Sequence, residues 1–304
     1  MELASEDLLG PPALGSRRYS RHLAACNSAT LCAVGADCTI RRLSLKGQLQ
    51  AEGKQADRAA NSDTAGPDLQ PTVPPCIPQH FRVSRNGDCA LLGGPTLDDS
   101  DRSALCLVEL PTGSQPSAAQ MEPLLIDAAL YDSHPGLEIF QIDWHPSSPA
   151  HFAVLTSDAT WRLYCLDDLS SPEQQIILRF RPSRKVGLTQ DIGSQSVACV
   201  AFCFGVDHAW ERFTVFFTCA DGAVYCMCPV APFRSTCPAS SLPLLHSLAA
   251  SASPADAGPT KEWLHQALPQ TEASTRSRML VQPHVLELHA PALIGPPGYL
   301  QPGP

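Results

Sequence analysis

Three polar residues near the middle of the chain have the side chains of a metal site. Asp143 and His145 alternate along one apolar run, and His151 follows that run after a turn. Imidazole and carboxylate groups are ordinary zinc ligands, but a strand that ends in polar turn residues has the same pattern. We therefore predict a structural role for these residues and no metal site.

Two aspartates have the side chains of a catalytic carboxylate pair. Asp158 and Asp221 each stand between two apolar runs, in the sequences S-D-A-T and A-D-G-A. An aspartate in this position commonly binds nearby backbone amides, and Asp-Gly favours a type I′ hairpin turn. Both residues are therefore predicted to shape turns.

The chain contains 13 cysteines. Cys26, Cys32 and Cys38 are evenly spaced but lack the closely paired cysteines of zinc sites. An odd count without a secretory signal favours reduced thiols, and a reduced cysteine packs as a small apolar residue. Buried, reduced and metal-free thiols are predicted for the cysteines within apolar runs, including Cys165, Cys203, Cys219 and Cys226.

Nucleotide and hydrolase motifs are absent from the sequence. The chain has neither the glycine-rich phosphate loops nor a G-x-S-x-G nucleophile turn. No catalytic residue and no cofactor-binding residue is predicted. An enzyme that uses a cysteine or a His/Asp site is accordingly the weakest of three functional hypotheses.

The chain segments that would position these residues consist mainly of short apolar runs. Residues 137–180 and 196–233 each contain three runs rich in Val, Ile, Phe, Tyr and Trp, separated by turn residues. Such runs suit strands and are too short for most helices. Similar groups of apolar runs occupy residues 22–45 and 77–110. Within 77–110, the three runs are joined by Asn86–Asp88 and by residues 93–101. The pattern predicts antiparallel blades of an all-β, β-propeller fold.

The blades at residues 137–233 carry a family resemblance. The blocks D-W-H-P-S-S-P-A-H-F-A-V-L-T-S-D-A-T-W-R-L-Y, F-G-V-D-H-A-W-E-R-F-T-V-F-F-T and A-D-G-A-V-Y-C-M-C-P-V-A-P-F occur in this order. They resemble the N-terminal propeller of nucleoporin 88 in its plant and green-algal form. K-E-W-L-H-Q-A-L-P resembles the helix that follows in that family.

We divide the chain into three predicted parts. Residues 1–21 form a flexible N-terminus, and residues 22–233 form the blades with a loop insertion at 46–75. Residues 234–304 form a Pro/Ala/Ser-rich segment with a short helix near 260–268 and the start of a further blade. About four blades and a fragment of a fifth are expected, an incomplete propeller with open edges. The chain is therefore expected to be part of a longer protein, or to close with a partner.

The resemblance implies a structural nucleoporin at the cytoplasmic face of the nuclear pore complex. It implies a scaffold, not an enzyme, that supports mRNA export and protein transport. The implied partners are nucleoporin 98 for the propeller, and nucleoporins 214 and 62 for the helical tail of the family. The alternative is a generic propeller adaptor, such as a ubiquitin-ligase substrate receptor, although the G-H and W-D repeats of that class are absent.

Charge and loop composition limit the partners further. The formal net charge of −9 and the lack of a basic cluster argue against direct nucleic-acid binding. No apolar run reaches the length of a membrane-spanning helix, and no small-molecule substrate is predicted. Trp144 and Trp161 are predicted to pack between blades. The loop residues Asp207, His208, Trp210 and Glu211 are the predicted partner surface.

Overall fold

The computed structural model divides into two compact units, which are described separately. Unit 1 comprises residues 1–144 and 168–171, and unit 2 comprises residues 145–167 and 172–304. The residues that the structure describes are 23–27, 30–34, 40–44, 76–110, 122–179, 198–206, 208–220, 222–232, 236–238, 241–251, 261 and 279–281. The predicted N-terminus at 1–21 and the insertion at 46–75 lie outside this part.

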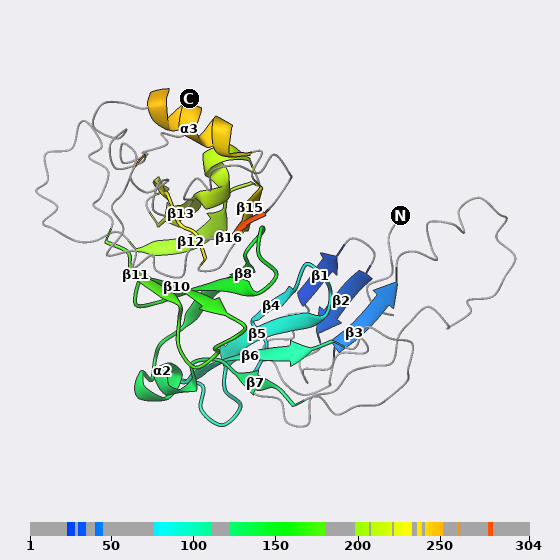
Figure 1. Ribbon diagram of the computed structural model, residues 1–304. Coiled ribbons are helices and arrows are strands. Elements are labelled where there is room, and N and C mark those ends of the chain that lie inside the picture. The colour runs from blue at the N-terminus through cyan, green and yellow to red at the C-terminus, as the bar shows by residue number, and fades with distance from the viewer. Residues whose placement is uncertain are drawn as a thin grey trace, which may run out of the picture. The chain divides into compact units, whose positions relative to one another are not determined.

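Unit 1 is built from two antiparallel sheets of consecutive strands (Figure 1). The first sheet contains β1 (Leu23–Asn27), β2 (Thr30–Val34) and β3 (Ile40–Ser44) in that order. The second contains β4 (His80–Val83), β5 (Cys89–Pro95), β6 (Ser103–Glu109) and the short β7 (Leu124–Leu125). Helix α2 (Ala128–Ser133) and strand β8 (Ile139–Trp144) complete the described elements of this unit.

A buried apolar cluster joins the two sheets of unit 1. It draws side chains from β2 and β3, from the second sheet and from residues just outside that sheet: Cys32, Val34, Ile40, Cys76, Phe81, Ala90, Leu92, Cys106, Val108 and Leu110. Each apolar side chain removed from water contributes about 1.5–3 kcal/mol. The short apolar runs thus become stable only when neighbouring sheets cover one another. Trp144 belongs to the same unit and donates its indole N–H to the carbonyl of Arg82 at 3.2 Å.

One predicted connection in unit 1 begins later than expected. Residues 93–101 were expected to join two strands, but Gly93, Gly94 and Pro95 continue β5, and the join runs over residues 96–102. The chain just before β4 pairs with them, because Ile77 donates its N–H to Pro95 and Gln79 donates to Gly93. A Cβ atom on Gly94 would lie 2.1 Å from the carbonyl oxygen of Ile77. The glycine therefore permits a close backbone approach inside a strand, which is a known use of strand glycine.

Unit 2 has the same meander pattern. Strands β9 (His151–Thr156), β10 (Thr160–Cys165) and β11 (Gln174–Ile177) pair in the order β11-β10-β9. Strands β12 (Cys199–Phe204), β13 (Val215–Cys219) and β14 (Val224–Met227) form the next sheet. All these pairs are antiparallel, as the sequence predicts for blades.

Aromatic rings form the core between the two sheets of unit 2. The indole of Trp161, on β10, is fully buried. Its ring centroid lies 6.3 Å from each ring of Phe202, Phe204 and Phe217. These contacts are edge-to-face, the arrangement that aromatic quadrupoles favour. The predicted role of Trp161 in packing between sheets is confirmed.

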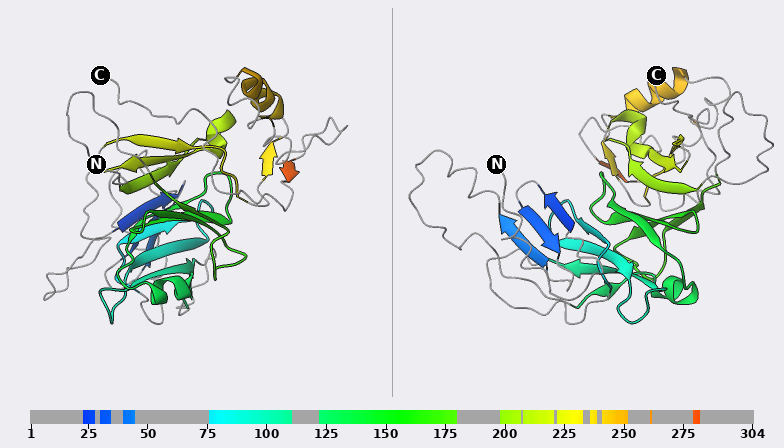
Figure 2. Two further views of the ribbon diagram at one scale, coloured as in Figure 1. Left: turned by 90° about the vertical axis from the view of Figure 1, so that its left-hand side faces the viewer. Right: turned by 180° about the vertical axis from the view of Figure 1, so that it is seen from behind.

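The C-terminal part of unit 2 contains a helix and two strands that were not predicted from the sequence. A strand β15 (Thr236–Pro238) pairs with β16 (Met279–Val281), and helix α3 (Leu242–Ser251) lies between them in sequence. Leu245 of α3 is buried, and α3 lies against the short helix η3 (Ala209–Phe213) (Figure 2). Only Lys261 of the helix expected at 260–268 is described, and of residues 281–288, where the start of a further blade was expected, only Val281 is described.

Candidate functional site

The predicted partner surface is mainly a short 3-10 helix, not an open loop. Helix η3 covers Ala209–Phe213, with His208 and Glu211 exposed and Trp210 half-buried. Asp207 lies outside the described residues. The loop was expected because the sequence D-H-A-W-E is polar and short, and a single 3-10 turn leaves no periodic pattern to detect.

Contacts with the flanking strands fix the position of η3. Gly205 donates its N–H to Thr214 at 2.8 Å, and a Cβ on Gly205 would lie 2.1 Å from the carbonyl oxygen of Glu211. The hydroxyl of Thr214 donates to the carbonyl of Trp210 at 2.8 Å. The Trp210 ring stacks edge-to-face on the buried Phe213, with centroids 6.2 Å apart. One part of the indole is thus fixed by packing while another part stays accessible to a partner.

The aspartate at the β9–β10 turn has the predicted role. Oδ1 of Asp158 accepts bonds from the Thr160 N–H at 3.2 Å and the Thr156 hydroxyl at 2.5 Å. Its Oδ2 accepts from the buried guanidinium of Arg162 at 2.8 Å. Burial raises the pKa of Asp158, but the bonds from Arg162 and Thr156 outweigh burial and leave the pKa lowered. Asp158 therefore shapes a turn and neutralises a buried cation, whereas Asp221 lies outside the described residues.

The predicted structural role of His145 agrees with its surroundings. Its side chain is buried against Phe204, with ring centroids 4.7 Å apart. Burial lowers the pKa of His145 to about 3, and the charges of His151 and Arg212 act in the same direction. The imidazole is therefore neutral near pH 7, and its Nδ1 accepts a bond from the Ser147 N–H at 3.3 Å. In unit 1, burial raises the pKa of Asp143 above its usual value, although the nearby Arg82 acts in the opposite direction.

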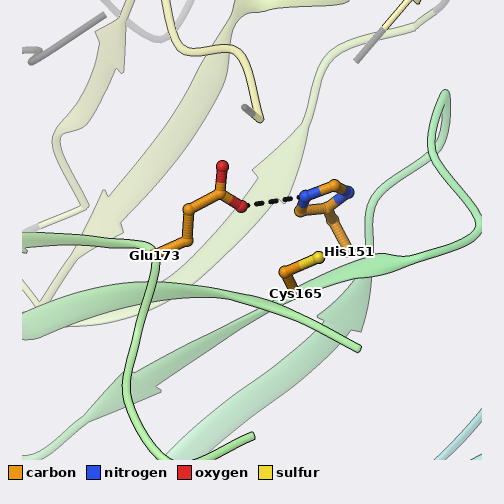
Figure 3. Close-up of side chains that lie close together, drawn as sticks. All are labelled: His151, Cys165 and Glu173. Atoms are coloured by element: carbon orange, nitrogen blue, oxygen red, sulfur yellow. Dashed lines mark ion pairs between the residues drawn. The ribbon is translucent and has the colours of Figure 1, made fainter. Parts of the chain in front are cut away.

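The structure brings His151 together with Cys165 and Glu173, two residues that sequence reasoning did not connect with it. One ligand atom from each side chain lies within 4.8 Å of the other two. Figure 3 shows the imidazole and the carboxylate facing each other, with the sulfur of Cys165 beside them. Nε2 of His151 is 2.8 Å from Oε2 of Glu173, and both side chains are largely buried.

A signal in the sequence connects part of this cluster. His151 and Cys165 are equally distant from the turn residue Asp158, so a hairpin centred there places them opposite each other, as the register shows. Glu173 is positioned by its own N–H, which donates to the carbonyl of Leu163 at 2.8 Å and starts the pairing of β11 with β10. The contact could not be predicted from the local sequence pattern, because a loop separates β10 from β11.

The prediction that the strand cysteines are buried is only partly correct. Cys219 is buried, but Cys203 is exposed, and Cys165 and Cys226 are partly exposed. Side chains alternate across a strand, so Cys203 points away from the face on which its neighbour Phe202 is buried. Where cysteines are deeply buried, as at Cys199, burial raises the thiol pKa to about 11. Ten cysteines of the described segments lie outside disulfide bonds.

Unit 1 contains a cavity of about 570 Å³ beside β6, β7 and α2. Leu105, Ile126 and Tyr131 form part of its lining, and Asp99 and Asp132 at its margin both pair with Arg102. The described lining contains no histidine, cysteine or lysine.

The comparison with curated proteins decides the family. The chain is 30% identical over 275 residues to the nuclear pore complex protein NUP88 of Arabidopsis thaliana. The chain belongs to the nucleoporin 88 family. The match covers 84% of this chain and 32% of the relative, so the chain spans about a third of the length of that curated nucleoporin. No protein-family model matches the chain.

A solved structure supports the same family fold. The chain superposes with a TM-score of 0.64 on the Nup82 N-terminal domain in the crystal structure of the Chaetomium thermophilum Nup82–Nup159 tail–Nup145N complex. Sequence identity is 17%, and the match covers 96% of this chain and 59% of that chain. The predicted fold class, an all-β propeller, is confirmed for this nucleoporin 88 relative, while the number of blades stays a prediction.

The helices of the described residues are short. Within the part of the chain that the structure describes, no helix is both long and apolar enough to span a membrane. The longest, α3, has 10 residues, against about 20 for a spanning helix.

Proposed function

We propose that this chain is the propeller part of a structural nucleoporin at the cytoplasmic face of the nuclear pore complex. The observation that carries the proposal is the 30% identity to Arabidopsis NUP88 over 275 residues. In this role the protein makes and breaks no bond. It positions other proteins of the pore, and it thereby supports mRNA export and protein transport.

The proposed partners are other nucleoporins. The Nup82 domain with the same fold was solved in a complex with the Nup159 tail and the Nup145N domain, which supports partners of this kind. For this family we propose nucleoporin 98 as the partner of the propeller, and nucleoporins 214 and 62 as partners of the full-length protein. The acidic net charge of −9 supports protein partners over nucleic acid.

The proposed contact surface is η3 with its flanking residues, from Asp207 to Glu211. Trp210 combines the features of an anchor, because the ring is partly exposed and one edge is held by Phe213. Partly exposed tryptophans with a fixed orientation are common hot spots of protein interfaces. His208 and Glu211 are both exposed and add polar contacts at the rim.

Replacing Trp210 with alanine tests this surface. We expect the affinity for the autoproteolytic domain of nucleoporin 98 to fall at least thirtyfold, on the order of 2 kcal/mol. The free energy of unfolding should fall by only about 1 kcal/mol, because the ring is not fully buried. Affinity is measured by calorimetry and stability by urea unfolding, with the exposed residue Leu97 changed to alanine as control.

Two outcomes count against the surface. A loss of stability of about 3–5 kcal/mol would identify Trp210 as a core residue. Unchanged affinity in a folded variant would place the partner elsewhere. If the wild-type protein captures no nucleoporin from cell extract, the proposed function itself is wrong.

A further inference from the structure

The cluster of His151, Cys165 and Glu173 has the donor atoms of a metal centre, independently of the proposed function. It offers one imidazole nitrogen, one thiol sulfur and one carboxylate oxygen, all within 4.8 Å of one another. Three different β-structures supply them: the start of β9, the end of β10 and the residue before β11. The donors therefore come from rigid backbone positions in one sheet (Figure 3).

The imidazole of His151 is held in the orientation of a ligand. Its Nδ1 lies 2.7 Å from the hydroxyl of Ser148, so Nε2 is directed toward Cys165 and Glu173. A second bond of this kind, on the ring nitrogen away from the ion, is the usual support of a metal-binding histidine. Nε2 makes no hydrogen bond of good geometry to any described residue, although Oε2 of Glu173 is only 2.8 Å away.

The contact between His151 and Glu173 is buried, unlike an ordinary ion pair at the protein surface. The side chains of His151 and Glu173 are 6% and 11% exposed. Buried polar groups normally meet well-aligned partners. Here a buried nitrogen and a buried oxygen lie 2.8 Å apart beside the sulfur of Cys165, so three donor atoms of an ion already share one place.

We propose that His151, Cys165 and Glu173 bind a zinc-type divalent ion, with Ser148 as the positioning residue for the imidazole. Mixed nitrogen, sulfur and oxygen donors suit Zn²⁺, whereas calcium and magnesium prefer oxygen alone. Zinc holds such donors at about 2.0–2.3 Å and keeps four ligands in a tetrahedron. Cys165 is partly exposed, so water can supply the fourth ligand.

The fit requires a small local change. Tetrahedral donors around zinc lie about 3.3–3.7 Å apart, so the 2.8 Å contact between His151 and Glu173 must widen. Rotation of the flexible Glu173 side chain supplies this movement, while Cys165 loses its proton on binding. The ion would link β9, β10 and the start of β11, and its effect is therefore on the stability of this sheet. The sequence predicted a metal-free Cys165, and that prediction did not take the nearby Glu173 into account.

Cobalt substitution tests the site through the sulfur ligand. Co²⁺ added to the purified, metal-stripped chain should bind in one equivalent and give a thiolate-to-cobalt charge-transfer absorption. Zn²⁺ should displace it and raise the melting temperature. In Cys165→Ser the charge-transfer band should disappear, and in Glu173→Gln the affinity for Zn²⁺ should fall at least tenfold.

Cys203→Ser is the matched control, because Cys203 is an exposed strand cysteine outside the cluster. This variant should keep both the band and the affinity. Glu173→Gln preserves size and one hydrogen-bond acceptor oxygen while removing the charge, and its circular dichroism reports whether it is folded. The proposal is overturned if the wild-type protein gives no thiolate band with Co²⁺. It is equally overturned if Cys165→Ser and Glu173→Gln, both folded, bind zinc as tightly as wild type.

Discussion

Replacing Trp161 with alanine is expected to destabilise unit 2 by about 3–5 kcal/mol. The indole is fully buried and contacts the rings of Phe202, Phe204 and Phe217. Its removal leaves a cavity between two sheets that these rings cannot collapse to fill. Since a domain is typically stable by only about 5–15 kcal/mol, a large part of the stability of unit 2 would be lost. Urea unfolding of the 304-residue chain, followed by circular dichroism, measures the change.

Two further variants make the Trp161 experiment specific. Ile177→Ala is the control, because Ile177 is apolar but largely exposed, and it should cost about 0.5 kcal/mol or less. Trp161→Phe should cost less than the alanine variant, because phenylalanine keeps an aromatic ring in the cluster and leaves a smaller cavity. If Trp161→Ala and Ile177→Ala cost the same, the aromatic cluster does not stabilise this unit.

Replacing Gly94 with alanine is expected to destabilise unit 1 by about 3 kcal/mol. The new Cβ would lie 2.1 Å from the carbonyl oxygen of Ile77. The hydrogen bonds from Ile77 to Pro95 and from Gln79 to Gly93 hold that backbone in place, so it cannot move without breaking them. The expected result is a lower urea midpoint.

Gly93→Ala is a matched control in the same strand. Its Cβ would meet the terminal methyl of Ile142 at 2.8 Å, and a side-chain end can rotate away where a backbone oxygen cannot. We expect a loss of about 1 kcal/mol for this variant. A larger loss for Gly93→Ala than for Gly94→Ala would contradict the close backbone approach beside β5.

Features of the fold that depend on local patterns were predictable from the sequence. Short runs of β-branched and aromatic residues with turn residues between them predicted the antiparallel strands. The placement of Asp158 between two such runs predicted the β9–β10 hairpin and its bonded carboxylate. Trp161 was predictable as a packing residue because a large aromatic within an apolar run is usually buried.

Features that depend on distant contacts were not predictable. Gly93 and Gly94 have the composition of a turn, and only the nearby backbone of Ile77 shows that they belong to a strand. Helix α3 is rich in Ser, Leu and Ala, and its contact with η3 supplies stability that its sequence does not show. Glu173 meets His151 through strand pairing across a loop. Such contacts are set by packing, which a local pattern does not contain.

Localisation of the full-length protein in living cells tests the central claim most directly. The protein is tagged at its own locus, and an antibody confirms that the fusion is intact and supports growth. We expect a punctate rim at the nuclear envelope that coincides with a known pore protein. Uniform cytosolic signal without a rim, from a fusion shown to be intact and functional, would contradict the proposal of a structural nucleoporin.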